Sequence, residues 1–370
     1  MYAARLATEL KKHANVEIFG MGGAQMRTAG VDVITDYSEV SVLGITEILS
    51  HLPQLRRAMR NLVSQGRARK PALAILTDFP GFHLRLARKL KPLGVKNVYY
   101  ICPQFWAWRP WRANLVRRRF ALALCIFPFE KKFFGDAGVP VKFVGHPLVS
   151  EVRATRSRTE FAANHGFDPT KPTITILPGS RWGEIARHLP TLLESTRELE
   201  RQKPSNYNFV LALSADTDLH RVKELIPQTV RLILVPGDTY NALAAADAAV
   251  ICSGTATVEA ALLDVPMVVV YKVSKLTALL AKPLIRTKYF GMVNLIAERE
   301  VAPELIQENF KPEKIAYEVQ QLLEPARSAR AHMDLAEVRR RLGPAGAVER
   351  AAEAILALLA SGARDSGNAS

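Results

Sequence analysis

The chain has 370 residues, of which 48% are hydrophobic, so it is long enough to form two domains that each bury a core. No stretch reaches about 18 consecutive apolar residues, which excludes a predicted membrane-spanning helix. No charged segment followed by a short apolar core marks a secretion signal, so we expect a cytoplasmic protein. The three cysteines, Cys102, Cys125 and Cys252, fit no zinc or CxxC spacing and are predicted to be buried, inert thiols.

The net charge of +15 is distributed unevenly along the chain. Residues 1–150 contain 23 Lys and Arg against 9 Asp and Glu, a net charge of +14, whereas residues 151–370 carry only +1. This asymmetry indicates that the first half meets an anionic partner, and the candidates are nucleic acid, acidic lipid or a phosphorylated substrate. The alternative is that the positive charge only keeps the first half in solution.

The chain opens with a helical pattern, MYAARLATELKKH, at residues 1–13. A doubly wound domain normally begins with a strand and a Gly-rich turn that lead into its first helix. Neither precedes this helix. Either the fold starts in an unusual way, or the first strand and loop of the N-terminal domain are missing from this chain.

Apolar runs then alternate with amphipathic helical patterns. Strands are predicted at residues 16–20, 73–77, 97–102, 122–127 and 141–144, and again at 173–177, 207–213, 231–235, 248–252 and 267–271. Helical stretches such as 83–91, 184–201 and 240–246 separate most of them. The alternation predicts an α/β fold with parallel sheets covered on both faces, and the two batches of strands predict two doubly wound, Rossmann-like domains facing a cleft.

The apolar pattern is interrupted within residues 151–172, which contain Pro169 and Pro172. We therefore expect an N-terminal domain over residues 1–160, a C-terminal domain over 161–345, a C-terminal helix over 346–360 and a disordered tail over 361–370. The C-terminal helix packs either on the first half of the chain or on a partner.

An apolar stripe adjoins a basic cluster in residues 42–63, VLGITEILSHLPQLRRAMRNLV. The apolar residues at helical spacing are Ile45, Ile48, Leu49 and Leu52, and the arginines that follow are Arg56, Arg57 and Arg60. Such a helix is typical of binding to an anionic lipid surface. The alternative is a core helix with a solvated basic end. No DNA- or RNA-binding signature accompanies these arginines, so we favour lipid over nucleic acid.

The stretch AILTDFPGFHLRLARKL, residues 74–90, places Asp78 at the carboxyl end of a predicted strand. Ligands bind at this end of parallel sheets, and a carboxylate there can take a proton from an attacking hydroxyl. The alternative is that Asp78 only caps the following helix. Two histidines are further titratable candidates. His83 is expected on the surface of that helix, and His146, in FVGHPLV, is either structural or part of the cleft.

Tryptophan and arginine interleave in YYICPQFWAWRPWRANLVRRRF, residues 99–120. The side chains concerned are Trp106, Trp108, Arg109, Trp111 and Arg112. Aromatic rings beside cations stack on nucleic-acid bases or lie at a lipid–water interface. Alternatively, the tryptophans pack beneath the domain and the arginines face water.

Two strand-to-helix turns carry small polar residues. They are Gly179-Ser180-Arg181, in TITILPGSRWGEIARHLP, and Ser253-Gly254-Thr255, in ICSGTATVEAALLDVPMVVVYK. Backbone N–H groups, hydroxyls and an arginine at the start of a helix bind anions, and a diphosphate is the usual occupant. Glu259, about one helical turn beyond the second turn, can accept hydrogen bonds from ribose hydroxyls. The alternative for the second turn is a helix capped by Ser253 without any ligand.

Eight segments in this order and spacing resemble the lipid-A-disaccharide synthases, a family of inverting glycosyltransferases with the GT-B fold. They are VLGITEIL, DFPGFHLRLA, CPQFWAWRPWR, FPFEKKFF, FVGHPL, LPGSRWGEI, SGTATVEAALLDVPMVVVYK and MVNLIAERE. The resemblance covers nearly the whole chain, from Tyr2 to about Leu359.

The resemblance implies that UDP-2,3-diacylglucosamine is joined to 2,3-diacylglucosamine 1-phosphate with release of UDP. It assigns the UDP-sugar site to Gly179, Ser180, Arg181, Glu184, Ser253, Gly254, Thr255, Glu259 and Asn294. With it, we expect Asp78 to act as the base and Arg181 to stabilise the leaving diphosphate, without a metal or other cofactor. The basic, tryptophan-rich first domain suits a phosphorylated, acylated acceptor. We therefore expect a peripheral protein at the inner face of the cytoplasmic membrane that binds no nucleic acid, and the family often forms homodimers.

The chain departs from the family pattern in two places. Family members often read Asp-x-Pro-Asp-Phe-Asn, where the second aspartate is a candidate base, but this chain has Gly81 at that position, which leaves Asp78. The family also has a first strand and a Gly-Glu-Ala-Ser-Gly-Asp-like loop just before the residues that match Tyr2. The missing loop predicts that Met1 is an internal methionine of a longer natural protein.

Three rival functions follow from the same residues. One is another GT-B enzyme that uses UDP-N-acetylglucosamine, such as the transferase of peptidoglycan precursor synthesis or a UDP-sugar 2-epimerase. Another is a truncated, inactive homologue that still binds UDP. The third is a nucleotide- or nucleic-acid-binding protein without enzyme activity, which salt-sensitive binding to DNA or RNA would reveal.

Overall fold

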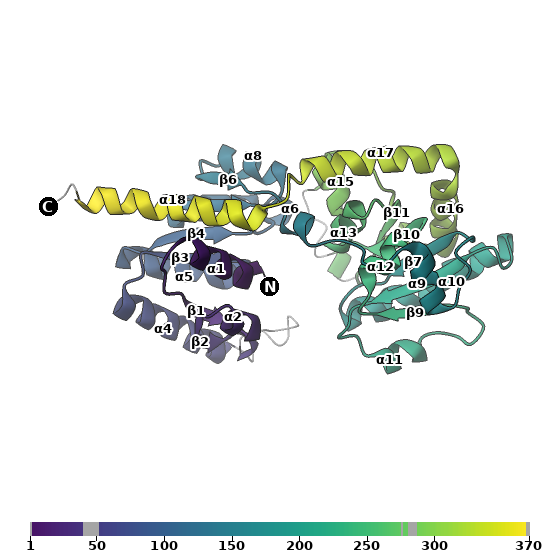
Figure 1. The fold of residues 1–370 in the computed structure, drawn as a ribbon, viewed down its shortest axis with the longest axis horizontal. Coiled ribbons are helices and arrows are strands. Elements are labelled where there is room, and N and C mark those ends of the chain that lie inside the picture. Colours follow the sequence, from purple (N-terminus) through teal and green to yellow (C-terminus); the bar gives the residue numbers. More distant parts are fainter. Residues whose placement is uncertain (1, 40–51, 275–276, 280–286, 368–370) are drawn as a thin grey trace. The chain divides into compact units, whose positions relative to one another are not determined.

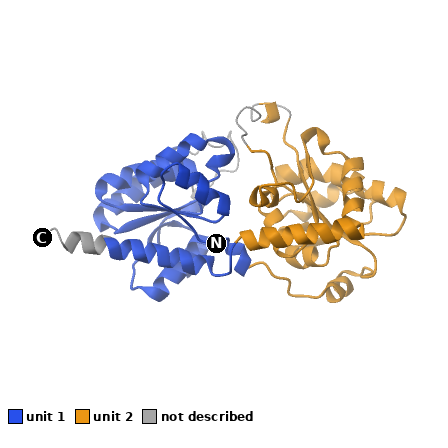
Figure 2. Ribbon diagram, turned by 90° about the horizontal axis from the view of Figure 1, so that it is seen from above, with its two compact units in different colours: residues 1–150, 343–370 blue, residues 151–342 orange. Residues whose placement is uncertain are grey.

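Parallel strands and helices alternate along the chain in the computed structural model, which describes residues 2–39, 52–274, 277–279 and 287–367 (Figure 1). The chain folds into two compact units (Figure 2). Unit 1 comprises residues 1–150 and 343–370, and unit 2 comprises residues 151–342. Every strand pairing in the described ranges is parallel. The predicted α/β class with two parallel-sheet units is therefore confirmed.

Unit 1 contains a four-stranded sheet in the order β3-β4-β5-β6 and a separate pair, β1-β2. Its strands are β1 (Phe19–Gly22), β2 (Asp32–Asp36), β3 (Leu73–Thr77), β4 (Lys96–Tyr100), β5 (Leu122–Cys125) and β6 (Val141–Phe143). Its helices are α1 (Tyr2–His13), α2 (Ala24–Thr28), α4 (Leu52–Arg69), α5 (Pro80–Leu90), α6 (Phe105–Trp108), α7 (Ala113–Arg119), α8 (Pro128–Asp136) and α18 (Ala347–Gly367). Helices α4, α5, α7 and α8 contribute apolar side chains to one core with the sheet.

The C-terminal helix α18 belongs to unit 1, where it packs against α1. Leu6 of α1 and Ile355 of α18 are both fully buried. The start of α18 is also hydrogen-bonded to this unit, because Arg350 Nε donates to the carbonyl of Val144 at 2.9 Å. Of the two predicted alternatives, the structure therefore has the helix on the first half of the chain. The helix continues to Gly367, whereas the sequence predicts a disordered tail from residue 361.

Unit 2 contains a six-stranded sheet in the order β12-β11-β10-β7-β8-β9. Its strands are β7 (Thr173–Leu177), β8 (Asn208–Leu213), β9 (Ile233–Pro236), β10 (Ala248–Cys252), β11 (Met267–Tyr271) and β12 (Glu304–Ile306). Its helices are α9 (Arg158–His165), α10 (Trp182–Gln202), α11 (Leu219–Glu224), α12 (Thr239–Ala244), α13 (Ala256–Leu262), α15 (Met292–Ala297), α16 (Pro312–Leu323) and α17 (Pro325–Arg341). Strands β7, β8 and β10 are buried along their whole length, as is typical of central strands in a parallel sheet that is covered on both faces.

The strand order of unit 2 is that of the Rossmann fold, and it determines where a ligand can bind. Numbered from β7, the order reads 3-2-1-4-5-6 from β9 to β12. From β7 the chain continues through β8 to β9 at one edge of the sheet. It then returns to β10, on the other side of β7, and continues through β11 to β12 at the opposite edge. The strand order therefore reverses between β7 and β10. Leu177 and Ile251, near the ends of these two strands, are paired in the ladder. The turns that follow them therefore start next to each other.

The first residues of unit 2 are fixed by hydrogen bonds within that unit. The N–H groups of Thr155 and Arg156 donate to the Asn241 side chain at 2.8 and 3.0 Å. Arg158 makes a bidentate ion pair with Asp247, with both N–O distances 2.8 Å. These contacts explain why unit 2 starts at residue 151, ten residues before the boundary that the sequence predicts.

All ten predicted strands overlap strands of the structure, and two further strands were missed. Strand β2 reads DVITD and strand β12 has only three residues, so neither gives the long apolar run on which the prediction depended. The cysteine prediction is confirmed, because all three thiols are free and buried, and burial raises their pKa values. No helix within the described ranges has both the length and the apolar character needed to cross a membrane.

Candidate active site

Asp78 lies in a strained turn between β3 and α5. Asp78 and the next residue, Phe79, have φ angles of 53° and 43°, in the left-handed region that non-glycine residues seldom adopt. Each such residue costs on the order of 1–3 kcal/mol, and strain of this kind is concentrated at functional sites. Pro80 then begins α5. The Asp78 side chain is exposed, and no described residue donates a hydrogen bond to its carboxylate. The alternative that Asp78 serves as a helix cap is therefore wrong.

Two buried side chains hold the main chain at this turn. The carbonyl oxygen of Asp78 accepts hydrogen bonds from His83 Nδ1 at 2.8 Å and from the Tyr99 hydroxyl at 3.0 Å. Burial lowers the pKa of His83, so its imidazole is neutral with the proton on Nδ1. The prediction that His83 lies on the helix surface is wrong, because α5 turns this residue inward and leaves it 8% exposed.

The tryptophan-rich segment has one anchored ring and two exposed rings. Trp106 donates its indole N–H to Glu130 at 3.2 Å, and its ring lies edge-on to Phe129. Trp108 and Trp111 are 40% and 59% exposed. The alternative that all three tryptophans pack beneath the domain therefore holds only for Trp106.

Arg112 brings a positive charge among these rings. Its guanidinium lies 5.5–5.9 Å from the ring centroids of Phe105, Trp108 and Trp111. Its Nε is buried and finds no hydrogen-bond acceptor in the described part of the chain. Burial raises the pKa of the Tyr99 hydroxyl, and the charge of Asp78 raises it further while that of Arg112 lowers it.

Glu130 is a fully buried carboxyl that supports this segment. Its two oxygens accept from the Trp106 indole and from the N–H of Phe127, the latter at 3.3 Å. Burial raises the pKa of Glu130 to about 8, so the carboxyl is largely neutral at pH 7. Sequence reasoning did not select Glu130, although it lies in the FPFEKKFF segment, where it is the only acidic residue among apolar and basic ones.

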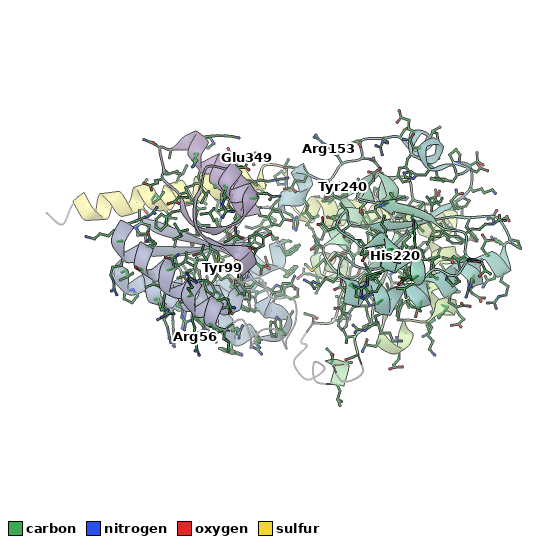
Figure 3. All side chains as sticks on the ribbon, turned by 90° about the horizontal axis from the view of Figure 1, so that it is seen from below. Arg56, Tyr99, Arg153, His220, Tyr240 and Glu349 are labelled. Atoms are coloured by element: carbon green, nitrogen blue, oxygen red, sulfur yellow. The ribbon has the colours of Figure 1, made fainter. Side chains whose placement is uncertain are left out.

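The basic helix α4 is a core helix over its described length. Leu55, Ala58 and Met59 pack against the core of unit 1. The arginines of the opposite face, Arg56, Arg57 and Arg60, are exposed (Figure 3 labels Arg56). Leu52 is half-buried at the start of the helix. The other predicted apolar residues, Ile45, Ile48 and Leu49, lie outside the described residues.

His146 is a structural residue. It is 2% exposed, and its ring lies 5.1 Å from that of Phe127. Its Nδ1 accepts a hydrogen bond from the N–H of Leu148 at 3.2 Å. Burial lowers the pKa of His146 to about 4, so it is neutral at physiological pH. The prediction that it is part of a cleft is not supported by this burial.

In unit 2, the turn after β7 is stabilised by an internal carboxylate. Glu184, in the first turn of α10, accepts hydrogen bonds from the N–H groups of Ser180 and Arg181 at 3.2 and 3.4 Å. Arg181 extends into solvent with its guanidinium 3.6 Å from the same carboxylate. Gly179 is required here, because a Cβ atom would lie 2.6 Å from the Cβ of Glu184. The expected backbone donors are thus present but occupied by Glu184.

The turn after β10 is more open. The Ser253 hydroxyl donates to the carbonyl of Phe290 at 2.8 Å, and α13 starts only after Thr255, so Ser253 is not the helix cap. No described residue accepts a hydrogen bond from the N–H of Gly254 or Thr255. A Cβ atom on Gly254 would meet nothing within 4 Å. These features leave room for a ligand over the second turn, beside the first.

Glu259 and Asn294 occupy different environments. Glu259 is half-buried and accepts a hydrogen bond from the Tyr240 hydroxyl at 3.2 Å, and burial raises its pKa. Asn294 is fully buried. Its amide binds Glu304 and the main chain of Val301 and Ala302 at 2.7–2.9 Å. Asn294 therefore holds the loop before β12, and its expected direct contact with UDP is not supported.

His188 was missed by sequence reasoning. It lies on the buried face of α10, where its Nδ1 bonds to the carbonyl of Pro178 at 2.9 Å and its Nε2 accepts from the N–H of Lys272 at 3.1 Å. It thus links the turn after β7 to the end of β11. The signal in the sequence was a histidine within the apolar stripe of a helix, between Ile185 and Leu189.

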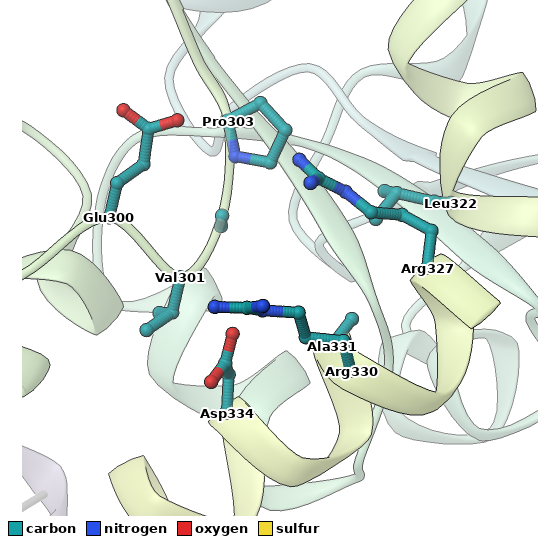
Figure 4. A pocket seen from close by; sticks show the side chains of 9 residues that line it. Glu300, Val301, Pro303, Leu322, Arg327, Arg330, Ala331 and Asp334 are labelled. Atoms are coloured by element: carbon teal, nitrogen blue, oxygen red, sulfur yellow. The ribbon is translucent and has the colours of Figure 1, made fainter.

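A pocket of about 350 Å³ lies elsewhere in unit 2 (Figure 4). It is lined by the loop from Glu300 to Pro303 and by side chains of α16 and α17, including Arg327 and Arg330. This loop leads into the amino end of β12. Because the sheet is parallel, the pocket lies at the opposite edge from the turns after β7 and β10 and is separate from the candidate site.

The fold is that of the GT-B class, because solved structures with this architecture cover nearly the whole chain. A protein-family model described as lipid-A-disaccharide synthetase matches residues 1–358, so the chain belongs to this family of glycosyltransferases.

Relatives of similar length support this membership. A lipid-A-disaccharide synthase of Myxococcus xanthus is 40% identical over 364 residues, covering 98% of this chain and 95% of that protein. One of Koribacter versatilis is 43% identical over 367 residues, covering 97% and 95%.

Two solved structures show the same fold at low sequence identity. The MnaA–UDP co-structure of S. aureus has a TM-score of 0.63 at 13% identity and covers 96% of this chain and 92% of that one. The UDP-GlcNAc 2-epimerase from Neisseria meningitidis bound to UDP-GlcNAc has a TM-score of 0.58 at 13% identity and covers 97% and 95%. At this identity the likeness to epimerases concerns the fold alone.

The pKa of Glu130 leads to a prediction about stability. Its value rises from an ordinary 4.5 to about 8 on folding, so the folded state binds more protons than the unfolded state between these pH values. The stability that Glu130 contributes is therefore full below about pH 4.5 and is lost as the pH rises through 8, by up to about 1.4 kcal/mol per pH unit.

We expect Glu130→Gln to flatten this dependence, because glutamine keeps an acceptor for Trp106 but does not titrate. Urea unfolding at several pH values between 5 and 8.5 measures the effect. The matched control is Glu353→Gln, at an exposed position of α18, which should follow the unchanged protein. Parallel curves for the unchanged protein and Glu130→Gln would contradict the prediction.

Proposed function

We propose that this chain transfers the diacylglucosamine unit of UDP-2,3-diacylglucosamine to the primary hydroxyl of 2,3-diacylglucosamine 1-phosphate, with inversion and release of UDP. The observation that carries the proposal is the pairing of the two polar turns at the point where the strand order of unit 2 reverses. Membership of the lipid-A-disaccharide synthetase family supports the identity of the two sugars.

Unit 2 binds the donor in this proposal. The diphosphate lies over the turn at Ser253–Thr255, where the N–H groups of Gly254 and Thr255 donate to no described residue, and beside the turn at Ser180 and Arg181. The exposed guanidinium of Arg181 turns from Glu184 to the diphosphate. The partly buried carboxylate of Glu259 accepts hydrogen bonds from the ribose hydroxyls.

Unit 1 binds the acceptor and activates its hydroxyl. The exposed carboxylate of Asp78 takes the hydroxyl proton, and the oxygen attacks the anomeric carbon of the donor. The bond from that carbon to UDP breaks, and Arg181 stabilises the charge that grows on the diphosphate. The 1-phosphate of the acceptor suits Arg112, whose buried Nε finds no acceptor among the described residues. The exposed rings of Trp108 and Trp111 suit its acyl chains.

The acylated substrates also call for a lipid surface. We include in the proposal that the protein works on the inner face of the cytoplasmic membrane and that Arg56, Arg57 and Arg60 of α4 face anionic headgroups. These arginines are exposed, whereas the apolar side of the described helix is used in the core. Their contribution is therefore electrostatic.

The proposed reaction is tested by incubating the chain with both acylated substrates and following UDP and the disaccharide. We expect equimolar formation of the two products and none when the acceptor is omitted. The control uses UDP-N-acetylglucosamine alone, which a 2-epimerase would convert and this protein should leave unchanged. UDP binding without product would instead support the inactive homologue.

Asp78→Asn should abolish turnover, because an amide cannot take the proton of the hydroxyl. We expect kcat to fall by a factor of about 10²–10⁴, with the Kd for UDP, measured by calorimetry, unchanged within about twofold. Asp136→Asn is the matched control, since Asp136 is an exposed acid of the same unit paired only with Lys132 on its own helix. Turnover by Asp78→Asn at the rate of the control would refute the assignment.

Replacing Arg56, Arg57 and Arg60 together by glutamine should weaken binding to vesicles that contain phosphatidylglycerol. Each cation near an anionic surface contributes about 1 kcal/mol, so the loss should be about 100-fold and should shrink as salt is added. Vesicle sedimentation measures it. The control is the triple exchange of Arg327, Arg330 and Arg340 of unit 2, which are exposed on α17. Equal binding by both triple variants would contradict the proposed surface.

A further inference from the structure

We propose that His83 and Tyr99 are positioning residues for Asp78. They fix the main chain of Asp78 so that its carboxylate is presented to the acceptor, without touching the substrates themselves. The inference rests on the proposed role of Asp78 as the base. It assigns a function to two buried polar groups of unit 1 that the proposed chemistry does not otherwise use.

The geometry at the carbonyl of Asp78 is the first argument. A carbonyl oxygen has two lone pairs, and here both are used, by His83 Nδ1 at 2.8 Å and by the Tyr99 hydroxyl at 3.0 Å. The two donors come from different elements, since His83 is in α5 and Tyr99 is in β4. The peptide group after Asp78 is therefore held from two directions.

The contrast between the main chain and the side chain of Asp78 is the second argument. Its carbonyl is held by two side chains that are 8% and 0% exposed, while its carboxylate is exposed and accepts no hydrogen bond from the described residues. Within the described part of the chain, the Asp78 side chain takes part in neither a helix cap nor an ion pair. This residue is fixed at its backbone and leaves its carboxylate available.

The backbone conformation is the third argument. Asp78 and Phe79 both have positive φ angles, which two consecutive non-glycine residues do not adopt without support from their surroundings. The Phe79 ring stacks on Phe82 with centroids 5.3 Å apart and meets the edge of His83 at 6.0 Å. His83 thus contacts both strained residues. If the Nδ1–H group of His83 is removed, the turn can relax and the Asp78 carboxylate can point in another direction.

The test compares His83→Leu with His83→Asn, two side chains of similar size. The asparagine amide places an N–H donor near the position of Nδ1, and leucine does not. Tyr99→Phe removes only the second donor. We expect kcat to fall about 10- to 100-fold in His83→Leu and Tyr99→Phe and to stay within about threefold in His83→Asn, because misplacing a reacting group by an ångström costs about this much. The Kd for UDP should not change in any of them.

A second comparison separates positioning from a general effect on folding. In the Asp78→Asn background, His83→Leu should lower the residual rate by less than twofold, because both changes act through the same carboxylate. A full 10-fold or greater loss in that background would overturn the inference. The inference would also be overturned if His83→Leu and Tyr99→Phe both kept the wild-type kcat while Asp78→Asn was inactive. That result would leave the assignment of Asp78 as the base intact. An active Asp78→Asn would overturn the base assignment, and the inference with it.

Discussion

In each unit, the candidate turn depends on a main-chain carbonyl that leaves the sheet where a strand gives way to a helix. A buried carbonyl without a partner costs about 1–3 kcal/mol, and at such a turn the ladder no longer supplies one. In each unit a histidine of the following helix donates through Nδ1, His83 to Asp78 at 2.8 Å and His188 to Pro178 at 2.9 Å. A second bond ties each turn to another strand, through Tyr99 of β4 in unit 1 and through Lys272, after β11, in unit 2. These bonds fix both turns through their carbonyl oxygens. In unit 1 the Asp78 carboxylate accepts no hydrogen bond from a described residue, whereas in unit 2 Glu184 also occupies the N–H groups of Ser180 and Arg181.

The distribution of charge matches the proposal that unit 1 binds the acceptor and unit 2 binds the donor. Residues 1–150 carry nearly all of the net positive charge, and their exposed groups include several arginines and the rings of Trp108 and Trp111. A phosphorylated glycolipid combines an anion with apolar chains, so such a surface suits both of its parts. The rest of the chain is almost neutral overall. In unit 2, the proposed nucleotide site therefore consists of a few local donors at the strand ends and does not need a general positive field. The described part of α4 fits this division, since its apolar side chains pack against the core of unit 1 and its arginines are exposed.

The sequence predicted the features that depend on local pattern. Long apolar runs located ten strands, and small polar residues after them located both turns of unit 2. The missed features depend on contacts between distant residues. His83 and His188 look like ordinary helical residues until the helices pack, and the apolar stripe of α10 was the only hint for the second. Asn294 lies in a segment typical of the family, but only the loop from residue 301 to Glu304 reveals that its amide is fully used. Strand β12, with three residues, exists only because β11 offers it a partner.

The two glycine-containing turns look equivalent in the sequence and differ in physical terms. Gly179 is required by the protein itself, because Glu184 occupies the space of a side chain and holds the N–H groups of Ser180 and Arg181. Gly254 has open space above it, and no described residue accepts a hydrogen bond from its N–H or from that of Thr255. In the proposed donor complex, the diphosphate therefore binds the donors of the second turn first. At the first turn it competes with a carboxylate whose hydrogen bonds are long and whose ion pair with the exposed Arg181 is weak in water. Glu184 holds these two donors in place in this structure, and in the proposed donor complex the doubly charged diphosphate takes its place.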